Sequence, residues 1–255
     1  MIDPLVVQLL AAREGGPKLP ATAGEGLTRA HILAVQEAVV ARLGRVGGFK
    51  VACPPDAPIV IAPIMARDIH ETPAEITVPR GEEVGLELEY AFRFIAPPPK
   101  SDAPDLEAQL CGAVEMLPAF EIVQSRLANP KGADGTLKML DNQLNGAVVL
   151  GAPRRDWRDI DLTRANARLT VDRETLLDGI AKVPGGSALA NLCALLRGLG
   201  DHCGGLRVGH VVITGSLNGL PWYQPPLTAS GWIEGFGPVD TTLRRSRPER
   251  ALVSP

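Results

Sequence analysis

Long apolar runs are missing from this sequence. Although 45% of the 255 residues are hydrophobic, no uninterrupted run approaches the roughly 20 residues that a helix needs to span a bilayer. The amino terminus, Met1-Ile2-Asp3-Pro4, carries an acid where a secretory signal peptide carries positive charge. We therefore expect a cytoplasmic protein without a membrane partner.

Cysteine and excess charge are also scarce. The four cysteines lack disulfide-framework spacing, so we expect reduced thiols. They also lack the C-x2–4-C pairs that are typical of zinc sites, and packing is the better account of them. A net charge of -3 gives no electrostatic reason to expect a nucleic-acid partner.

Apolar spacing predicts helices at the start of the chain and strands after it. We expect helices over residues 4–14 and 29–43, the second with Thr28 as N-cap and Gly44 as terminator. Beyond Gly47, short β-rich runs alternate with Pro and Gly. These runs predict strands near residues 49–52, 59–61, 76–78, 85–94, 120–123, 147–150, 167–171 and 211–214, with helices near 106–117 and 187–199. The order is typical of an α+β protein with one strand-rich body.

The segment 85–94 alternates strictly and places two acids on one face of a strand. Glu87 and Glu89 are two residues apart, so their side chains start about 7 Å from each other. They can converge on one small object, but they repel each other if nothing lies between them. A bound cation satisfies this pattern, and a solvent-exposed face of an amphipathic sheet is the alternative.

A third acid interrupts an apolar run at residues 117–123. Glu121 lies in what reads as a buried strand, where a carboxylate needs a hydrogen bond, a counter-charge or a metal. Three carboxylates without Cys or His describe a site for a hard cation such as Mg²⁺ or Mn²⁺. The alternative for Glu121 is a salt bridge to an arginine such as Arg126.

The order of motifs around these acids resembles the 2-keto-4-pentenoate hydratase family, which includes the oxo-heptenedioate hydratases and 4-oxalocrotonate decarboxylases of the fumarylacetoacetate hydrolase superfamily. The resemblance covers residues 30–243. The matching pieces are Gly48-Phe49-Lys50-Val51, Glu87-Leu88-Glu89, residues 118–126, Asp141-Asn142 with residues 146–151, and residues 206–216.

The resemblance implies a fumarylacetoacetate hydrolase-like fold, a curled mixed β-sheet around a central site. We expect an N-terminal helical subdomain over residues 1–46, a catalytic domain over 47–243 and a flexible tail over 244–255 that holds Arg244, Arg245, Arg247 and Arg250. A homo-oligomer is expected from the resemblance alone.

The acids and the resemblance together predict chemistry on a small-molecule 2-oxo acid. A cation held by Glu87, Glu89 and Glu121 can accept a keto and a carboxylate oxygen and stabilise an adjacent enolate. The leading hypothesis is a hydratase of aromatic catabolism that adds water to a 2-hydroxy-2,4-dienoate and forms a 4-hydroxy-2-oxo acid. A decarboxylase or C–C hydrolase that uses the same enolate, and a non-catalytic homologue, are the alternatives.

The family pattern also implies catalytic side chains. Lys50 matches its lysine, which is expected to bind a substrate carboxylate, or to move a proton if burial lowers its pKa, and a solvated strand lysine is the alternative. Asp68 is the candidate acid/base from a segment before the paired acids, with His70 or Glu71 as substitutes and a polar surface turn as the competing interpretation. Asp141 matches an acid that orients lysine or water, although a turn or cap is the alternative.

Three further residues are candidates for binding substrate. Asn142 belongs to the Asp-Asn motif, and Thr214 and Ser216 follow a predicted strand with donors for a carboxylate, or form a turn. The chain departs from the family beside Asn142, where Gln143 replaces the usual small polar residue. Substrate contacts at that point therefore differ from those of the family.

Overall fold

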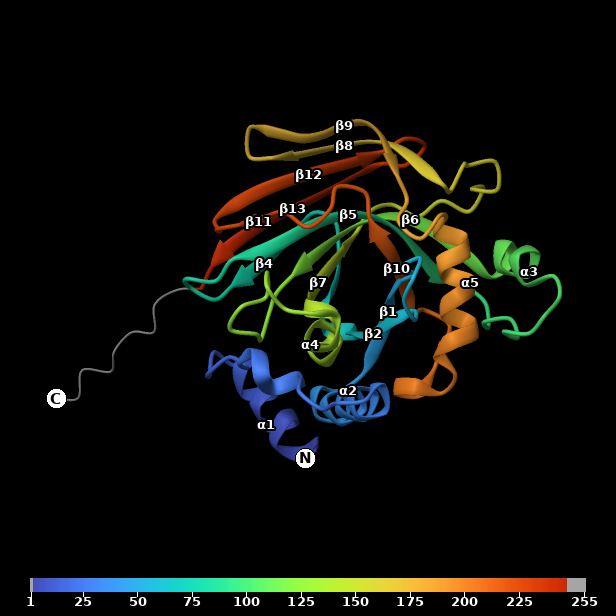
Figure 1. Ribbon diagram of the computed structural model, residues 1–255. Helices are drawn as coiled ribbons and strands as arrows, with labels where there is room; N and C mark the ends of the chain where they lie inside the picture. The colour runs from blue at the N-terminus through green and yellow to red at the C-terminus, as the bar shows by residue number, and fades with distance from the viewer. Residues whose placement is uncertain (1, 247–255) are drawn as a thin grey trace.

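Two mixed β-sheets form the body of the molecule (Figure 1). The structure, a computed structural model, describes residues 2–246. Within that range, the first sheet has the strand order β2-β1-β10-β5-β6-β7-β3, with β11 paired to β5, and the second has the order β4-β13-β12-β8-β9. The predicted α+β class is confirmed.

The first sheet is formed by β1 (Val46–Ala52), β2 (Val60–Met65), β3 (Ile69–Glu71), β5 (Val84–Phe94), β6 (Val114–Val123), β7 (Asn145–Leu150), β10 (Val211–Ser216) and β11 (Trp222–Tyr223). Strands β1 and β10 are parallel, as are β3 and β7, whereas the other neighbours in this sheet are antiparallel. The sheet curls (Figure 1), and one of its faces is therefore concave.

The second sheet packs against the outer face of the first (Figure 1). It is formed by β4 (Ala74–Val78), β8 (Arg164–Val171), β9 (Glu174–Lys182), β12 (Leu227–Ile233) and β13 (Pro238–Arg245). The main core contains the alternating apolar residues of β5, with Leu88 and Phe92 fully buried. Burying each such side chain contributes about 1.5–3 kcal/mol to the free energy of folding. The apolar face of β5, which the alternation predicted, therefore fixes the position of this strand against the core.

The N-terminal helices share a second core with the segment before β7. Helix α1 (Ile2–Arg13) and α2 (Arg29–Leu43) pack with residues of α4 (Gly135–Leu140) and the turn that follows it. The Thr28 hydroxyl accepts a hydrogen bond from the backbone N–H of His31, and Gly44 ends α2 at a φ of 110°. The predicted cap and terminator of α2 are confirmed.

The remaining helices are α3 (Leu106–Ala113) and α5 (Ala188–Leu199), with short 3-10 turns η1 (Ala21–Gly24), η2 (Ala66–Asp68), η3 (Asn142–Leu144) and η4 (His202–Gly204). The prediction of a helix to residue 117 was wrong, because β6 begins at Val114, which pairs with Phe94 of β5. Cross-strand pairing along β5 outweighs local helix propensity there. None of the helices in residues 2–246 combines the length and apolar character needed to cross a membrane.

Strands of the second sheet were harder to predict. β9 is largely exposed and contains Gly179, and β12 is built mostly from small residues. β13 continues through Arg244 and Arg245, the first two residues of the expected tail, and Arg244 forms an ion pair with Glu75. Arg247 and Arg250 lie outside the described residues.

Gly48 allows two parallel strands to approach each other closely beside the site described below. A Cβ at Gly48 would lie 2.0 Å from the carbonyl oxygen of Val211, so Gly48→Ala is expected to reduce the free energy of unfolding by about 1–3 kcal/mol. Gly112→Ala is the control, since a Cβ there meets nothing within 4 Å and should stabilise α3 by about 0.5–1 kcal/mol. Urea denaturation measures both, and equal effects would contradict this account of β1.

Candidate active site

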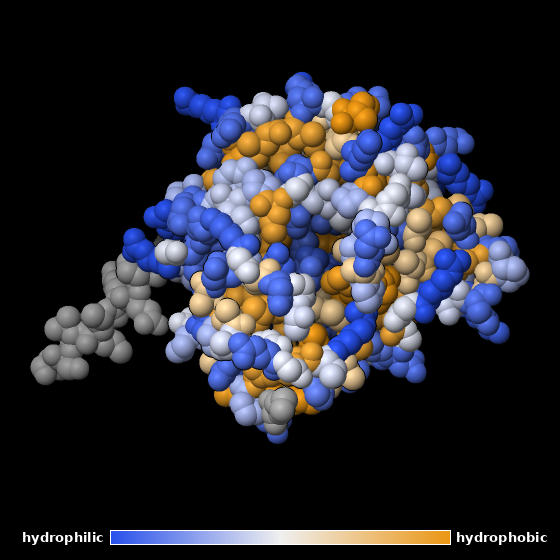
Figure 2. All heavy atoms as spheres, in the orientation of Figure 1, coloured by the Kyte–Doolittle hydropathy of each residue, from blue (hydrophilic) through white to orange (hydrophobic). Residues whose placement is uncertain are grey.

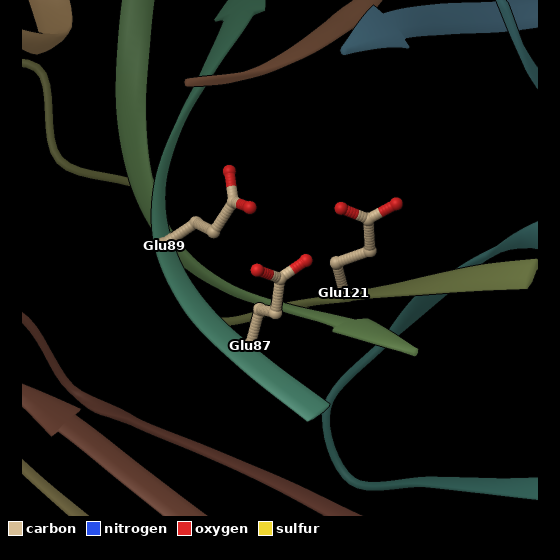
Figure 3. A group of neighbouring side chains, drawn as sticks. All are labelled: Glu87, Glu89 and Glu121. Atoms are coloured by element: carbon tan, nitrogen blue, oxygen red, sulfur yellow. The ribbon is translucent and has the colours of Figure 1, made fainter. Parts of the chain in front are cut away.

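Sheet pairing brings the three predicted acids together. Glu87 of β5 lies directly opposite Glu121 of β6, and Glu89 is two residues along the same face. One carboxylate oxygen of each residue lies within 4.8 Å of those of the other two. The three side chains extend into the same space (Figure 3). We call Glu87, Glu89 and Glu121 the glutamate cluster.

Two members of the glutamate cluster are buried and the third, Glu87, is half-buried, which excludes the solvent-exposed face as an account of it. Glu121 is 0% exposed and Glu89 2%. Burial, followed by the negative charge of Glu121, raises the pKa of Glu87 to about 8. Burial and the charges of Glu121 and Glu87 also raise the pKa of Glu89 well above its ordinary value. The protein alone thus leaves the negative charge of the cluster poorly compensated.

Oxygen ligands in this arrangement fit a hard divalent cation. Each residue contributes a carboxylate oxygen, and His and Cys do not take part in the group, which is the donor chemistry that Mg²⁺ and Mn²⁺ prefer. A divalent ion between the three carboxylates removes the repulsion that burial intensifies. The residues present therefore fit the cation expected from the sequence.

Lys50 supplies the cationic partner of Glu121. Its Nζ lies 2.5 Å from Oε1 and 2.6 Å from Oε2 of Glu121, and 3.1 Å from the carbonyl oxygen of Gln143. Burial opposes the charge of Lys50, but the carboxylates of Glu121, Glu87 and Glu89 outweigh it and raise the pKa of Lys50. Because β1 is three strands from β6 in the first sheet, the curl of the sheet is what brings Lys50 to Glu121.

Two further donors contact the glutamate cluster; the sequence suggested a backbone donor near Gly215 for a carboxylate but did not predict Glu89 as its acceptor, and it did not predict Asn145. The backbone N–H of Gly215 donates to Glu89 over 2.7 Å, and the side-chain amide of Asn145 donates to Glu121 over 3.3 Å. Gly215 has a φ of 115°, in the region that favours glycine. Side-chain types do not reveal a backbone donor, so the glycine of the Thr-Gly-Ser motif was the only signal in the sequence for the Gly215 N–H.

A cavity of about 310 Å³ opens beside the glutamate cluster. Its wall combines Lys50, Lys138, Gln143 and Ser216 with apolar side chains that include Val51, Val123, Leu144, Pro184, Ile213 and Leu220. The space-filling view shows a hollow near the middle of one face, with hydrophilic side chains at its floor (Figure 2). Such a cavity can hold a small anionic molecule with a short carbon chain.

The Asp-Asn motif lies behind this cavity. Asp141 is buried, pairs with the Arg126 guanidinium and accepts from the backbone N–H of Arg126 over 2.8 Å. The salt bridge between Arg126 and Glu121 that the sequence left open is therefore not formed. The amide oxygen and nitrogen of Asn142 are both buried, with no hydrogen-bond partner among residues 2–246.

Thr214 and Ser216 have different surroundings. Thr214 is buried and its hydroxyl donates to the carbonyl oxygen of Tyr90 over 3.0 Å, so it stabilises the pairing of neighbouring strands. Ser216 lines the cavity, and its hydroxyl donates to the carbonyl oxygen of Gly219 over 2.7 Å. The structure thus brings Ser216, but not the hydroxyl of Thr214, to the cavity wall.

The structure does not bring Asp68 to the glutamate cluster. Asp68 lines a separate cavity of about 180 Å³ with Arg13, Arg67 and Arg126. Burial raises the pKa of Asp68, although the arginines oppose that shift. Its suggested substitutes lie elsewhere, because β3 carries His70 and Glu71 at the far edge of the first sheet.

The sequence left a turn open at Asp141-Asn142, but it did not predict the left-handed conformation of the three residues after Asp141. Asn142, Gln143 and Leu144 have φ values of 47°, 52° and 60°, a conformation that side chains other than glycine rarely adopt. Lys138 of α4, a half-buried side chain at the cavity wall, was also missed. Gln143, Leu144 and Lys138 lie outside the motifs recognised in the sequence. The departure from the family pattern at Gln143 was the one signal in the sequence for this part of the site.

Comparison with solved structures identifies the architecture. The chain aligns with 4-oxalocrotonate decarboxylase from Pseudomonas putida G7, complexed with magnesium and adipate, at a TM-score of 0.78 and 14% identity, over 95% of this chain and 98% of that one. A putative fumarylacetoacetate hydrolase family protein from Yersinia pestis CO92 aligns at a TM-score of 0.57 and 17% identity, over 77% and 92%. The chain has the fumarylacetoacetate hydrolase fold.

Two comparisons of the sequence gave different results. No family model matches the sequence. This fumarylacetoacetate hydrolase-fold chain is 34% identical over 138 residues to a curated 2-keto-4-pentenoate hydratase from Paraburkholderia phymatum, a match that spans 52% of this chain and 50% of that relative. It thus spans about half the length of the curated relative. The fold that the resemblance implied is confirmed.

Cation binding should stabilise this fumarylacetoacetate hydrolase-fold protein. Mg²⁺ or Mn²⁺ at about 100 times its Kd is expected to add about 2.7 kcal/mol to the free energy of unfolding, visible as a higher Tm than in EDTA. Glu89→Gln should abolish that increase, because it removes a ligand charge. In EDTA the variant should be at least as stable as the wild type, since one of the repelling carboxylates is gone.

Glu83→Gln is the matched control, because Glu83 pairs with Lys131 on the surface. It should keep the full cation response. If Glu89→Gln responds to Mg²⁺ as strongly as the control, Glu89 is not a ligand.

Proposed function

We propose that this protein is a divalent-metal-dependent hydratase that converts a 2-hydroxy-2,4-dienoate into a 4-hydroxy-2-oxo acid in aromatic catabolism. The observation that carries the proposal is the buried glutamate cluster, joined to Lys50, at the wall of a 310 Å³ cavity. A curated relative named 2-keto-4-pentenoate hydratase supports the choice of reaction. The proposal includes a cytoplasmic homo-oligomer, as the family resemblance implies.

In this proposal the glutamate cluster holds Mg²⁺ or Mn²⁺. When bound, the cation supplies Lewis-acid stabilisation of the negative charge that develops on a 2-oxo acid. The 4-oxalocrotonate decarboxylase structures named as complexes with magnesium or calcium support a divalent ion. The hydrogen bonds from Gly215 and Asn145 orient the carboxylates of Glu89 and Glu121 toward it.

Lys50 is the proposed substrate-binding donor and proton carrier. Its contact with both oxygens of Glu121 fixes the position of Nζ. A donor held in this way can bind a substrate oxygen, or deliver a proton to the carbon beside it, when one of its three hydrogen bonds to Glu121 and Gln143 is exchanged for one to the substrate. The apolar side chains of Val51, Leu144 and Leu220 at the wall accommodate the carbon chain.

Decarboxylation is the second candidate reaction. It is favoured by structural similarity to two 4-oxalocrotonate decarboxylase structures, at TM-scores of 0.78 and 0.80 over 95% of this chain. Both reactions, like C–C hydrolysis, need stabilisation of the same kind of anion, so the glutamate cluster serves any of them. Fold does not decide between them.

A direct assay tests the proposal. Purified protein with Mg²⁺ should remove the dienol absorbance of freshly generated 2-hydroxypenta-2,4-dienoate and form 4-hydroxy-2-oxopentanoate, whereas EDTA should stop the reaction. Carbon dioxide released from 4-oxalocrotonate would favour the decarboxylase instead. Absence of turnover together with absence of cation affinity would indicate a non-catalytic homologue.

Lys50→Met is expected to lower kcat by about 100-fold or more, the contribution of a positioned acid or base. Its control is Lys131→Met, an exposed lysine that pairs with Glu83 and should leave kcat unchanged. Steady-state rates with Mg²⁺ measure both variants. A rate for Lys50→Met equal to that of the control would make Lys50 a structural residue.

A further inference from the structure

Gln143 lies at the wall of the cavity in a strained backbone conformation. Its φ of 52° falls between the left-handed values of Asn142 and Leu144. Strain of this kind persists where the surrounding structure enforces it, and it concentrates at functional sites. Gln143 is also the residue at which the chain departs from the family pattern beside Asp141-Asn142.

The turn is held at both ends. Before it, Asp141 is fixed by the buried ion pair with Arg126. After it, the carbonyl oxygen of Leu144 accepts from the backbone N–H of Gln124 over 2.9 Å, and the Leu144 side chain is buried in the second core. These contacts keep Gln143 at the cavity wall despite its unfavourable φ.

Two oxygen atoms of Gln143 have different partners. The carbonyl oxygen accepts from Lys50 Nζ over 3.1 Å. The side-chain Oε1 is buried and has no hydrogen-bond partner among residues 2–246. Buried polar atoms almost always have a partner, so an oxygen without one calls for a donor from outside the chain.

The neighbouring groups do not provide that donor. With a divalent cation bound, the carboxylates of the glutamate cluster are ionised and only accept hydrogen bonds. Lys50 has three N–H groups, and its three hydrogen bonds go to the two oxygens of Glu121 and the carbonyl of Gln143. Lys138, also at this wall, makes no hydrogen bond to Gln143 within the described part of the chain. A hydroxyl group on the ligand would satisfy Oε1.

We propose that Gln143 is a specificity residue, whose Oε1 accepts a hydrogen bond from the C4 hydroxyl of a 4-hydroxy-2-oxo acid. This inference rests on the proposed function, because the glutamate cluster and its cation hold the 2-oxo acid end of the same molecule. The cavity then distinguishes the hydroxylated acid from its deoxy analogue.

The test compares two ligands of the Mg²⁺-loaded protein by titration calorimetry, 4-hydroxy-2-oxopentanoate and 2-oxopentanoate. Wild-type protein should bind the hydroxy acid about five- to tenfold more tightly, as expected for one hydrogen bond to a buried acceptor. Gln143→Leu should reduce the affinity for the hydroxy acid to that for 2-oxopentanoate, while the affinity for 2-oxopentanoate stays unchanged.

A second variant guards against misfolding of Gln143→Leu. Gln143→Asn tolerates a left-handed backbone but is one methylene too short, so it should also lose the preference. Gln124→Asn is the control, since the Gln124 side chain lies at the separate cavity of Asp68, and it should keep the preference.

The outcomes separate this inference from the proposed function. Mg²⁺-dependent binding of both acids without preference for the hydroxy acid, or a preference that survives in both Gln143 variants, overturns the role of Gln143 and leaves the cation site intact. Absence of Mg²⁺-dependent binding for either acid overturns both. Loss of the preference in the variants, with binding of 2-oxopentanoate retained, supports the role.

Discussion

Mutual repulsion of three neighbouring carboxylates, two of them buried and one half-buried, is the constraint on which this structure depends. Glu87, Glu89 and Glu121 meet in a space where burial raises the pKa values of the first two. The fold supplies one ammonium group, from Lys50, and two neutral donors. This compensation leaves a deficit of positive charge that a divalent ion corrects. The cost of assembling the acids without a cation is thus inseparable from their capacity to bind one.

The outer face of the first sheet contributes to stability, and its inner face carries the charged site. The outer face of β5 packs with the second sheet through a continuous apolar core, so the strand cannot shift register without exposing that core. The inner face of the same strand carries the acids. Because the curl of the sheet also brings Lys50 inward, the precision of the charged site derives from packing on the opposite side.

The sequence predicts side-chain patterns better than it predicts backbone geometry. Alternation placed Glu87 and Glu89 on one face, and an apolar interruption singled out Glu121, because both signals are periodic. The alternative of a salt bridge between Arg126 and Glu121 was wrong, because Arg126 pairs with Asp141. Proximity in sequence does not reveal that pairing. The hydrogen bond from Gly215 and the left-handed turn at Gln143 depend on tertiary packing, and no local pattern encodes them.

Different parts of the fold support the two walls of the cavity. Strands β5 and β6 carry the glutamate cluster. The turn of Gln143 packs with the N-terminal helices in the second core, where the Gln36 side chain of α2 donates to the carbonyl oxygen of Met139 over 2.7 Å. Repacking of α1 and α2 can therefore move one wall of the cavity while the wall that carries the glutamate cluster stays in place. Divergence in the helical layer is thus a route by which the shape of the cavity can change without disturbing the three acids.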